Sequence, residues 1–212
     1  MTRMSTTANM PAASRPAARR GRPGYERADI LRIAVASFIE HGYDATSMSI
    51  LGERLGLSKS AIYHHVPSKD ELLRVALDEA LGSLEAVLHE ARELDVRSDE
   101  RLEFFIRGAV RALIENLPTV TLLLRVRGNS ETERAALARR RDFDRATTDL
   151  MIQARDDGYL RPDIDPRLAT RLVFGMVNSI VEWYKPSDAR NADAIADATI
   201  TITLRGLSDE RS

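Results

Sequence analysis

The sequence predicts an all-α protein, in which an N-terminal three-helix unit with a helix-turn-helix is followed by a larger helical domain. Three observations predict this class. Apolar residues recur at helical spacing along most of the chain, capping patterns separate these stretches, and residues 46–69 have the pattern of two short helices joined by a tight turn. About nine helices are expected.

Residues 46–69 have the spacing of a helix-turn-helix. In the first helix an apolar stripe faces inward, because its members fall at i, i+3 and i+7. The stripe consists of Met48, Leu51 and Leu55. Gly56 follows, where a left-handed backbone lets the chain turn, and Ser58 then caps a second helix over residues 59–65.

The second helix is too short to be stable alone, since isolated helices below about 12 residues are marginal in water. Ile62 points back toward the first helix, which leaves Ser60 and His64 on the opposite face, with Ala61 and Tyr63 on its flanks. A helix-turn-helix places such a face in the major groove of DNA. An αα-hairpin that serves packing alone is the alternative at this point.

Residues 25–72 resemble the DNA-binding region of the TetR (tetracycline-repressor) family. The family pattern AxxxFxxxGYxATS is matched by Ala34, Phe38, Gly42, Tyr43, Ala45, Thr46 and Ser47. Residues 56–72, GLSKSAIYHHVPSKDEL, match the turn, the recognition helix and the start of the next helix. Ile50 departs from the pattern, because the family usually carries a polar residue there, and Leu51-Gly52 replaces the common Ile-Ala.

The resemblance implies a homodimeric, ligand-responsive transcriptional repressor, and a two-fold dimer implies a near-palindromic operator. We expect DNA contacts from Arg20, Arg22, Thr46, Ser47, Lys59, Ser60, Ala61, Tyr63, His64 and Lys69. Lys59 would face guanine acceptors and Ala61 a thymine methyl group. Lys69 would lie in the first turn of the next helix, where free N–H groups favour phosphate.

Charge is distributed unevenly along the chain, although the formal net charge is only -1. Residues 1–69 hold ten Lys or Arg against five Asp or Glu, whereas the remainder holds 21 against 27. Only the first part is therefore expected to meet a polyanion. Residues 1–24 show no apolar period and predict a disordered basic arm. Within it, Arg20-Gly21-Arg22-Pro23 resembles the core of an AT-hook, which lays arginines in a narrow minor groove; a tail that adds only phosphate attraction is the alternative.

Cysteine content and the length of apolar stretches indicate the cellular compartment in which the protein is expected. The chain has no Cys, which excludes disulfides and thiolate chemistry and agrees with a reducing cytosol, so a cytoplasmic location is expected. The longest uncharged apolar stretch, residues 172–181, falls short of the ~20 residues that span a bilayer. No apolar signal-peptide region is seen at the N-terminus, and no membrane partner is expected.

Two domains are expected, a helix-turn-helix domain over residues 25–69 and an effector-binding and dimerisation domain over residues 70–212. Capping pairs, Pro and Gly set the helix limits. The expected helices cover residues 26–41, 46–55, 59–65, 68–92, 99–117, 119–127, 130–157, 165–183 and 191–207. The last is the least certain, because residues 199–204 alternate like a strand. Helix is favoured, since Ile195, Ala198 and Ile202 also fit one helical face.

By the resemblance, the larger domain encloses an effector pocket. Its candidate lining residues are Phe104, Phe105, Leu122, Leu123, Val126 and Leu150, with Ile106 and Leu113 in the same apolar set. Core packing explains each of them equally well. Residues 158–166 and 183–186 resemble family members that control fatty-acid or steroid breakdown and respond to acyl-coenzyme A. Arginines that could meet its phosphates are Arg125, Arg127, Arg139, Arg140 and Arg141, although a solvated face is the alternative.

The resemblance also implies that the last two helices pair with their copies across a two-fold axis. Candidate dimer-interface residues are Val173, Met176, Val177 and Ile180, which are many apolar groups for a solvated helix. Small residues, namely Ala169, Gly175 and Ser179, permit close approach of another helix. The alternative is that this helix is the core of its own domain.

No catalytic pattern or cofactor motif is found in the sequence, so an enzyme is not expected. His64 and His65 are adjacent on a helix and cannot chelate one ion together. Asp163 and Asp165 are the remaining candidates for a metal, but Asp165 is better placed as a helix cap, and no metal is expected. A DNA-binding regulator has two alternatives at this point. One is a protein-interaction module that uses the helix-turn-helix for packing, and the other is a helical enzyme.

Overall fold

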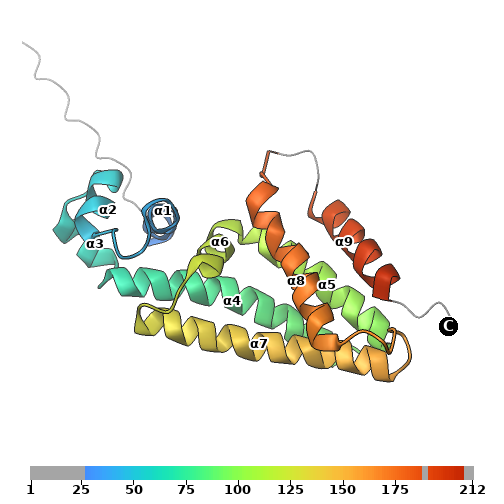
Figure 1. Ribbon diagram of the computed structural model, residues 1–212. Helices are drawn as coiled ribbons and strands as arrows, with labels where there is room; N and C mark the ends of the chain where they lie inside the picture. Colours follow the sequence, from blue (N-terminus) through green and yellow to red (C-terminus); the bar gives the residue numbers. More distant parts are fainter. Residues whose placement is uncertain (1–26, 188–190, 208–212) are drawn as a thin grey trace, which may run out of the picture.

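The computed structural model describes residues 27–187 and 191–207, and every regular element in these ranges is an α-helix (Figure 1). The elements are α1 (Arg27–His41), α2 (Met48–Leu55), α3 (Lys59–His65), α4 (Lys69–Glu93), α5 (Ser98–Glu115), α6 (Leu117–Arg125), α7 (Glu131–Asp156), α8 (Pro166–Trp183) and α9 (Ala192–Leu207). This confirms the predicted class. The predicted basic arm, with Arg20 and Arg22, lies outside the described residues.

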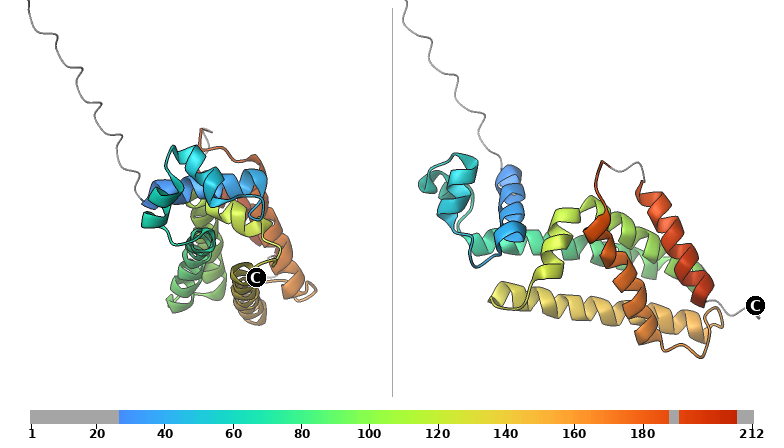
Figure 2. Two further views of the ribbon diagram at one scale, coloured as in Figure 1. Left: turned by 90° about the vertical axis from the view of Figure 1, so that its left-hand side faces the viewer. Right: turned by 45° about the horizontal axis from the view of Figure 1, so that its top comes forward.

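The molecule is elongated, with α1, α2 and α3 at one end (Figures 1 and 2). Helix α4 leaves this unit and runs beside α7 into the larger part, where α5, α6, α8 and α9 complete the helical domain. Helix α1 also packs against α6, so two separate contacts join the small unit to the rest.

The turn between α2 and α3 forms as its residues dictate. Ser47 caps α2 by accepting a hydrogen bond from the N–H of Ile50 at 3.2 Å, and Ser58 caps α3 by accepting from the N–H of Ala61 at 3.1 Å. Between them Gly56 adopts φ 63°, a left-handed conformation that is strained for residues with a Cβ. The chain can therefore reverse within three residues.

Apolar burial holds the three N-terminal helices together. Ile62, on the inner side of α3, is 0% exposed, as is Leu51 on α2. They belong to one buried cluster that continues through α1 and the first half of α4. The cluster includes Ile30, Ala34, Phe38, Leu55, Leu72, Leu73, Ala76 and Leu77. Burial of each Ile, Leu or Phe side chain among them stabilises the fold by ~1.5–3 kcal/mol, which compensates for the poor stability of short helices.

A charged clamp fixes α7 to α4. The guanidinium of Arg139 donates to Asp78 at 2.6 Å and to Glu85 at 2.7 Å. These carboxylates raise the pKa of Arg139, with the hydrogen bond to Glu85 as the largest cause. Arg139 is therefore a structural residue, which corrects its expected role in meeting a ligand's phosphates.

Helix limits differ from the sequence-based expectation mainly around α6. Helix α5 ends at Glu115, before the expected limit, and Pro118 lies in the first turn of α6, where its missing N–H costs nothing. Helix α6 then ends at Arg125, because Val126 has an extended backbone with ψ 141°.

Helix α9 is confirmed despite its strand-like alternation. The hydroxyls of Thr199 and Thr203 donate to backbone carbonyls four residues earlier, at 2.8 and 2.7 Å, so these side chains are satisfied within the helix. Ile195 and Ile200 are buried, and the helix packs mainly on α5. In the described part of the chain, no helix is long and apolar enough to cross a membrane.

We predict opposite effects from alanine at two glycines. Gly56→Ala should lower the free energy of unfolding by about 1 kcal/mol, because alanine is strained in the left-handed region. Gly82→Ala, in the middle of α4, should raise it by about 0.5–1 kcal/mol, because a methyl group there would meet no neighbouring atom within 4 Å. Urea unfolding measures both changes, and shifts in the same direction would contradict this assignment.

Candidate nucleic-acid interface and ligand cavity

The outer side of α3 is open to solvent. Ser60 and His64 are exposed, Tyr63 is 45% exposed, and Ala61 is half-buried beside them. Lys59 begins the helix, but its side chain lies outside the described part of the structure. The burial of the inner side and the exposure of these residues give α3 the geometry of a recognition helix.

Two residues next to α3 differ in their availability. Ser47 is exposed at the start of α2. Thr46 is only 1% exposed, and its hydroxyl donates to the carbonyl of Gly42 at 2.8 Å. Thr46 therefore closes the turn after α1 and cannot offer its hydroxyl to DNA, which corrects its predicted role.

Lys69 lies in the first turn of α4 and is half-buried. Its ammonium donates to the carbonyl of Tyr43 at 2.8 Å and lies 4.1 Å from the centroid of the Tyr43 ring. These contacts hold the positive charge close to the N-terminus of α4, where free N–H groups also attract anions.

A polar junction connects the helix-turn-helix unit to the larger domain. The carboxylate of Asp70 accepts hydrogen bonds from the Tyr43 hydroxyl at 3.3 Å and from the Thr132 hydroxyl, on α7, at 2.7 Å. Arg125, at the end of α6, donates to the carbonyl of Ile39 on α1 at 3.0 Å. Sequence reasoning missed this junction, because its partners lie up to 86 residues apart.

Burial and neighbouring carboxylates act on Tyr43. Burial of the phenol is the largest cause, and the charge of Asp70 is the second; together they raise the pKa of Tyr43 to about 12. The neutral phenol is thus the form that the folded junction accommodates.

A groove of about 510 Å³ lies beside this junction, between α1, α6 and the start of α7. Leu122, Val126 and Arg127 line it, together with Phe38 and Tyr43. From the sequence, the first two were expected in the effector pocket and Arg127 near a ligand's phosphates. The structure instead places all three near the helix-turn-helix unit.

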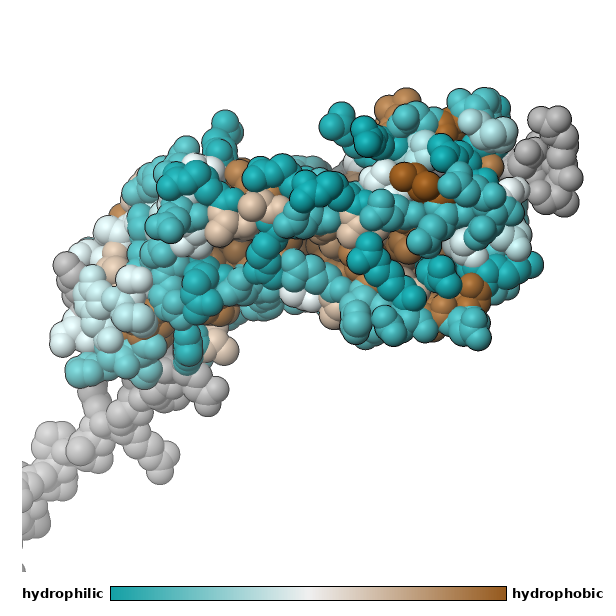
Figure 3. All heavy atoms as spheres, turned by 90° about the horizontal axis from the view of Figure 1, so that it is seen from below, coloured by the Kyte–Doolittle hydropathy of each residue, from teal (hydrophilic) through white to brown (hydrophobic). Residues whose placement is uncertain are grey.

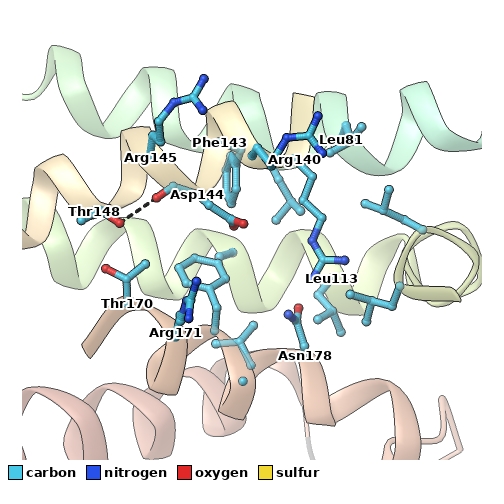
Figure 4. A pocket seen from close by; sticks show the side chains of 18 of the residues that line it. Leu81, Leu113, Arg140, Phe143, Asp144, Arg145, Thr148, Thr170, Arg171 and Asn178 are labelled. Atoms are coloured by element: carbon cyan, nitrogen blue, oxygen red, sulfur yellow. Dashed lines mark hydrogen bonds between the residues drawn. The ribbon is translucent and has the colours of Figure 1, made fainter. Parts of the chain in front are cut away.

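A larger cavity of about 900 Å³ lies among α4, α5, α6, α7 and α8 (Figure 4). Its apolar wall is formed by Leu81, Leu84, Ala109, Leu113, Val120, Leu123, Leu124, Phe143, Phe174 and Val177. Its polar and charged lining comes from α7 and α8, and consists of Arg140, Arg141, Asp144, Arg145, Thr148, Asp149, Arg167, Thr170, Arg171 and Asn178. The cavity can therefore hold a molecule with an apolar and an anionic part.

Of the six predicted pocket residues, Leu123 alone lines this cavity. Phe105 is fully buried behind the wall, with its ring centroid 6.0 Å from that of Phe143 and 5.8 Å from that of Phe174. Leu150 is buried in the same cluster, whereas Phe104 is exposed. The helices of this domain bury several apolar stripes. The sequence alone does not show which of these stripes pack closely against another helix and which line a cavity.

Charges at the cavity act on Asp144. Burial raises the pKa of its carboxyl, while the positive charges of Arg140 and Arg171 oppose that rise. Arg140 and Arg141 were expected near a ligand's phosphates; the residues on α8 were missed. A signal for them existed, since Arg167, Arg171 and Asn178 share one side of an otherwise apolar helix.

The outward side of α8 carries an apolar stripe. Leu168, Leu172 and Met176 recur every four residues and are exposed, with Leu172 at 65%. Val173, Val177 and Ile180, by contrast, are buried in their own chain. The dimer prediction is corrected accordingly, because only Met176 of the predicted set is free to meet a second copy.

Other large hydrophobic side chains are also exposed, among them Val96, Phe104, Trp183 and Ile202. The face seen from below is mainly hydrophilic, and hydrophobic residues show along its middle and in patches near its right-hand end (Figure 3). In the part of the chain that the structure describes, no group of three or more His, Asp or Glu is arranged to hold a metal ion.

Comparisons with known proteins match both parts of the chain. Residues 30–76 match the family model described as "Bacterial regulatory proteins, tetR family". Residues 95–207 match the model described as "Tetracyclin repressor-like, C-terminal domain". The "HTH-type transcriptional repressor KstR2" of Mycobacterium tuberculosis H37Rv is 25% identical over 198 residues, which cover 90% of this chain and 96% of that protein.

Solved structures show the same fold. SCO3833 of Streptomyces coelicolor A3, a member of the TetR transcriptional regulator family, is 48% identical, with a TM-score of 0.79 over 85% of this chain and 91% of that chain. AibR, solved "in complex with isovaleryl coenzyme A and operator DNA", is 25% identical, with a TM-score of 0.69 over 83% of this chain and 96% of that chain.

We predict that the phenol of Tyr43 ionises well above the usual range of a tyrosine. It should titrate near pH 12, and Tyr43→Phe should remove that step from an ultraviolet titration. Because the folded pKa lies above the unfolded value of about 10, the associated stability is present below pH 10 and is lost as the pH rises toward 12. Loss of a step near pH 10 instead would contradict the burial of this phenol.

Proposed function

Because the chain belongs to the TetR family of bacterial regulatory proteins, and is therefore a DNA-binding regulator of transcription rather than an enzyme, we propose that it is a ligand-responsive repressor. It would bind a near-palindromic operator as a homodimer in the cytoplasm and leave it when a small-molecule effector binds. The outward face of α3 supports this proposal most directly, together with the cavity in the larger domain.

Operator binding would use the face of α3 and its two flanks. Lys59 and Ser60, in the first turn of the helix, would lie toward base edges, with Ala61 against a thymine methyl group. Tyr63, His64 and Ser47 would contact the phosphate backbone, because exposed hydroxyl and imidazole groups donate to phosphate oxygens. Lys69 would add its charge at the N-terminus of α4.

Dimerisation would bury the exposed stripe on α8. Leu168, Leu172 and Met176 form a continuous apolar row, and Ile202 on α9 is also exposed. A solvated helix rarely leaves such a row in water, since exposed apolar patches mark interaction surfaces. A second copy related by a two-fold axis would cover the row and place the two α3 helices on successive major grooves, roughly 34–36 Å apart.

The effector would bind in the cavity between α7 and α8. Its volume of about 900 Å³ suits a ligand of moderate size, and its wall is apolar while its rim carries arginines. We propose an acyl-coenzyme A thioester, with the acyl group against Leu123 and Phe174 and a phosphate near Arg140 or Arg141. Support comes from AibR, which was solved with isovaleryl coenzyme A and operator DNA.

Effector and operator would be coupled through α4 and the polar junction. The cavity wall includes Leu81 on α4 and Val120 on α6, and both helices also pack against α1. A ligand that displaces α6 would therefore act on the Arg125–Ile39 contact. By linkage, the effector weakens operator binding by the same factor by which the operator weakens effector binding. A ligand with equal affinity for both forms would change nothing.

We predict that Tyr63→Ala weakens operator binding without unfolding the protein. Tyr63 is on the exposed side of α3, so its loss should cost about 1–2 kcal/mol of binding, roughly tenfold in Kd. Fluorescence anisotropy with operator DNA measures the change, and circular dichroism checks the fold. Phe104→Ala serves as the control. It removes an exposed aromatic ring from α5 instead of α3 and should leave operator binding unchanged. If Tyr63→Ala and the wild type bound operator DNA with equal affinity, α3 would not be the DNA-contacting helix in the way proposed.

We predict that Leu172→Asp separates the dimer. An aspartate in the middle of the α8 stripe would bury an unpaired charge at the proposed interface, which costs several kcal/mol. Light scattering after size-exclusion chromatography should show a monomer, and operator affinity should fall with it. Val96→Asp, at another exposed apolar site, serves as the control. A dimeric Leu172→Asp protein would show that this face is not the interface.

A further inference from the structure

An acidic side chain lies among the arginines of the cavity. Asp144 extends from α7, and Arg171 and Asn178 extend from α8 toward the same space (Figure 4). Arg140 precedes Asp144 by one helical turn and lines the same cavity. The carboxylate of Asp144 thus lies in the same space in which an anionic group of a ligand would bind to the two arginines.

The carboxylate of Asp144 is not engaged in a hydrogen bond or an ion pair within the described structure. Among the described residues, none donates a hydrogen bond to it or forms an ion pair with it, and the Thr148 hydroxyl donates to its backbone carbonyl instead. Arg140 and Arg171 still act on it through their charges. The two guanidinium groups therefore interact with this carboxylate electrostatically without forming an ion pair with it.

The other charges around the cavity do not replace this one. Arg145 pairs with Asp142, and Asp149 lies 3.9 Å from Arg92. Arg141 and Arg167 add positive charge on α7 and α8, while α4, α5 and α6 contribute only apolar residues to the wall. Of the two described acidic residues that line the cavity, Asp144 and Asp149, Asp144 is the one on which the charges of Arg140 and Arg171 act.

We propose that Asp144 is a built-in competitor for the anionic group of the effector, and that it thereby sets which ligands the cavity accepts. This inference rests on the proposed role of the cavity in binding an effector. A ligand carrying an anion has to share Arg140 and Arg171 with this carboxylate, so weakly held monoanions are disfavoured. A neutral apolar ligand is indifferent to it.

The competition makes the charge of the ligand decisive. A unit charge that repels another within the same partly solvated site changes an affinity by about three- to tenfold. Removing the charge of Asp144 should therefore strengthen binding of an anionic amphipath by that factor. It should leave binding of the same molecule without its charge unchanged, because the apolar wall is the same for both.

The test compares two fluorescent probes, 11-(dansylamino)undecanoic acid and its methyl ester, on the full-length protein without DNA. Asp144→Asn should bind the acid about three- to tenfold more tightly than wild type does, and the ester equally well. Arg171→Gln should bind the acid more weakly. Glu131→Gln, which removes an exposed carboxylate at the start of the same helix and outside the cavity lining, is the matched control and should alter neither affinity.

The outcomes separate this inference from the proposed function. If wild type binds both probes and Asp144→Asn changes neither affinity, or changes both equally, the competitor role is overturned while the ligand cavity stands. If neither wild type nor Asp144→Asn binds either probe, the cavity is not a site for apolar anions, and both proposals are overturned. A selective gain for the acid supports both.

Discussion

The burial of Ile62 is the contact on which the helix-turn-helix depends. Helix α3 has seven residues and would not persist alone, so its position is imposed by the apolar cluster that its inner side enters. That same burial leaves Ser60, Tyr63 and His64 outside. One packing interaction thus both stabilises the shortest helix and determines which of its residues remain exposed.

Helix α4 extends this constraint into the rest of the molecule. Its first half is buried with α1 in the cluster of the helix-turn-helix unit, and its later residues Leu81 and Leu84 line the large cavity. The junction through Asp70 adds a polar contact to α7. DNA would therefore act at the start of α4 and the ligand near its middle, which is the physical basis for the proposed coupling.

Local chemistry made most of the fold predictable. Serine caps, the left-handed Gly56 and helical apolar spacing determine helix limits through neighbours in the sequence, and α3 was predicted with the limits observed. The exposed side of α3 followed from the same spacing. Thr46 was misassigned, because its partners are carbonyls that only the folded turn brings to it.

The cavity and the exposed side of α8 were harder to predict for a related reason. Both sides of α8 are apolar, so the sequence did not tell which side Val173 and Leu172 would face; packing on α5 and α7 decides this. The cavity depends on five helices together, and Asp144 acquires its meaning only beside Arg171, 27 positions away in the sequence by residue number. Such contacts need the tertiary structure.

In the proposed function, two copies of the α3 face read a DNA duplex together. Selection of binding sites from a random double-stranded library by the purified protein, followed by sequencing, tests it most directly. We expect enrichment of a motif with two-fold symmetry, whose half-sites are about one helical turn or a multiple of it apart. Enrichment of no motif, or of one half-site without a symmetric partner, would contradict it.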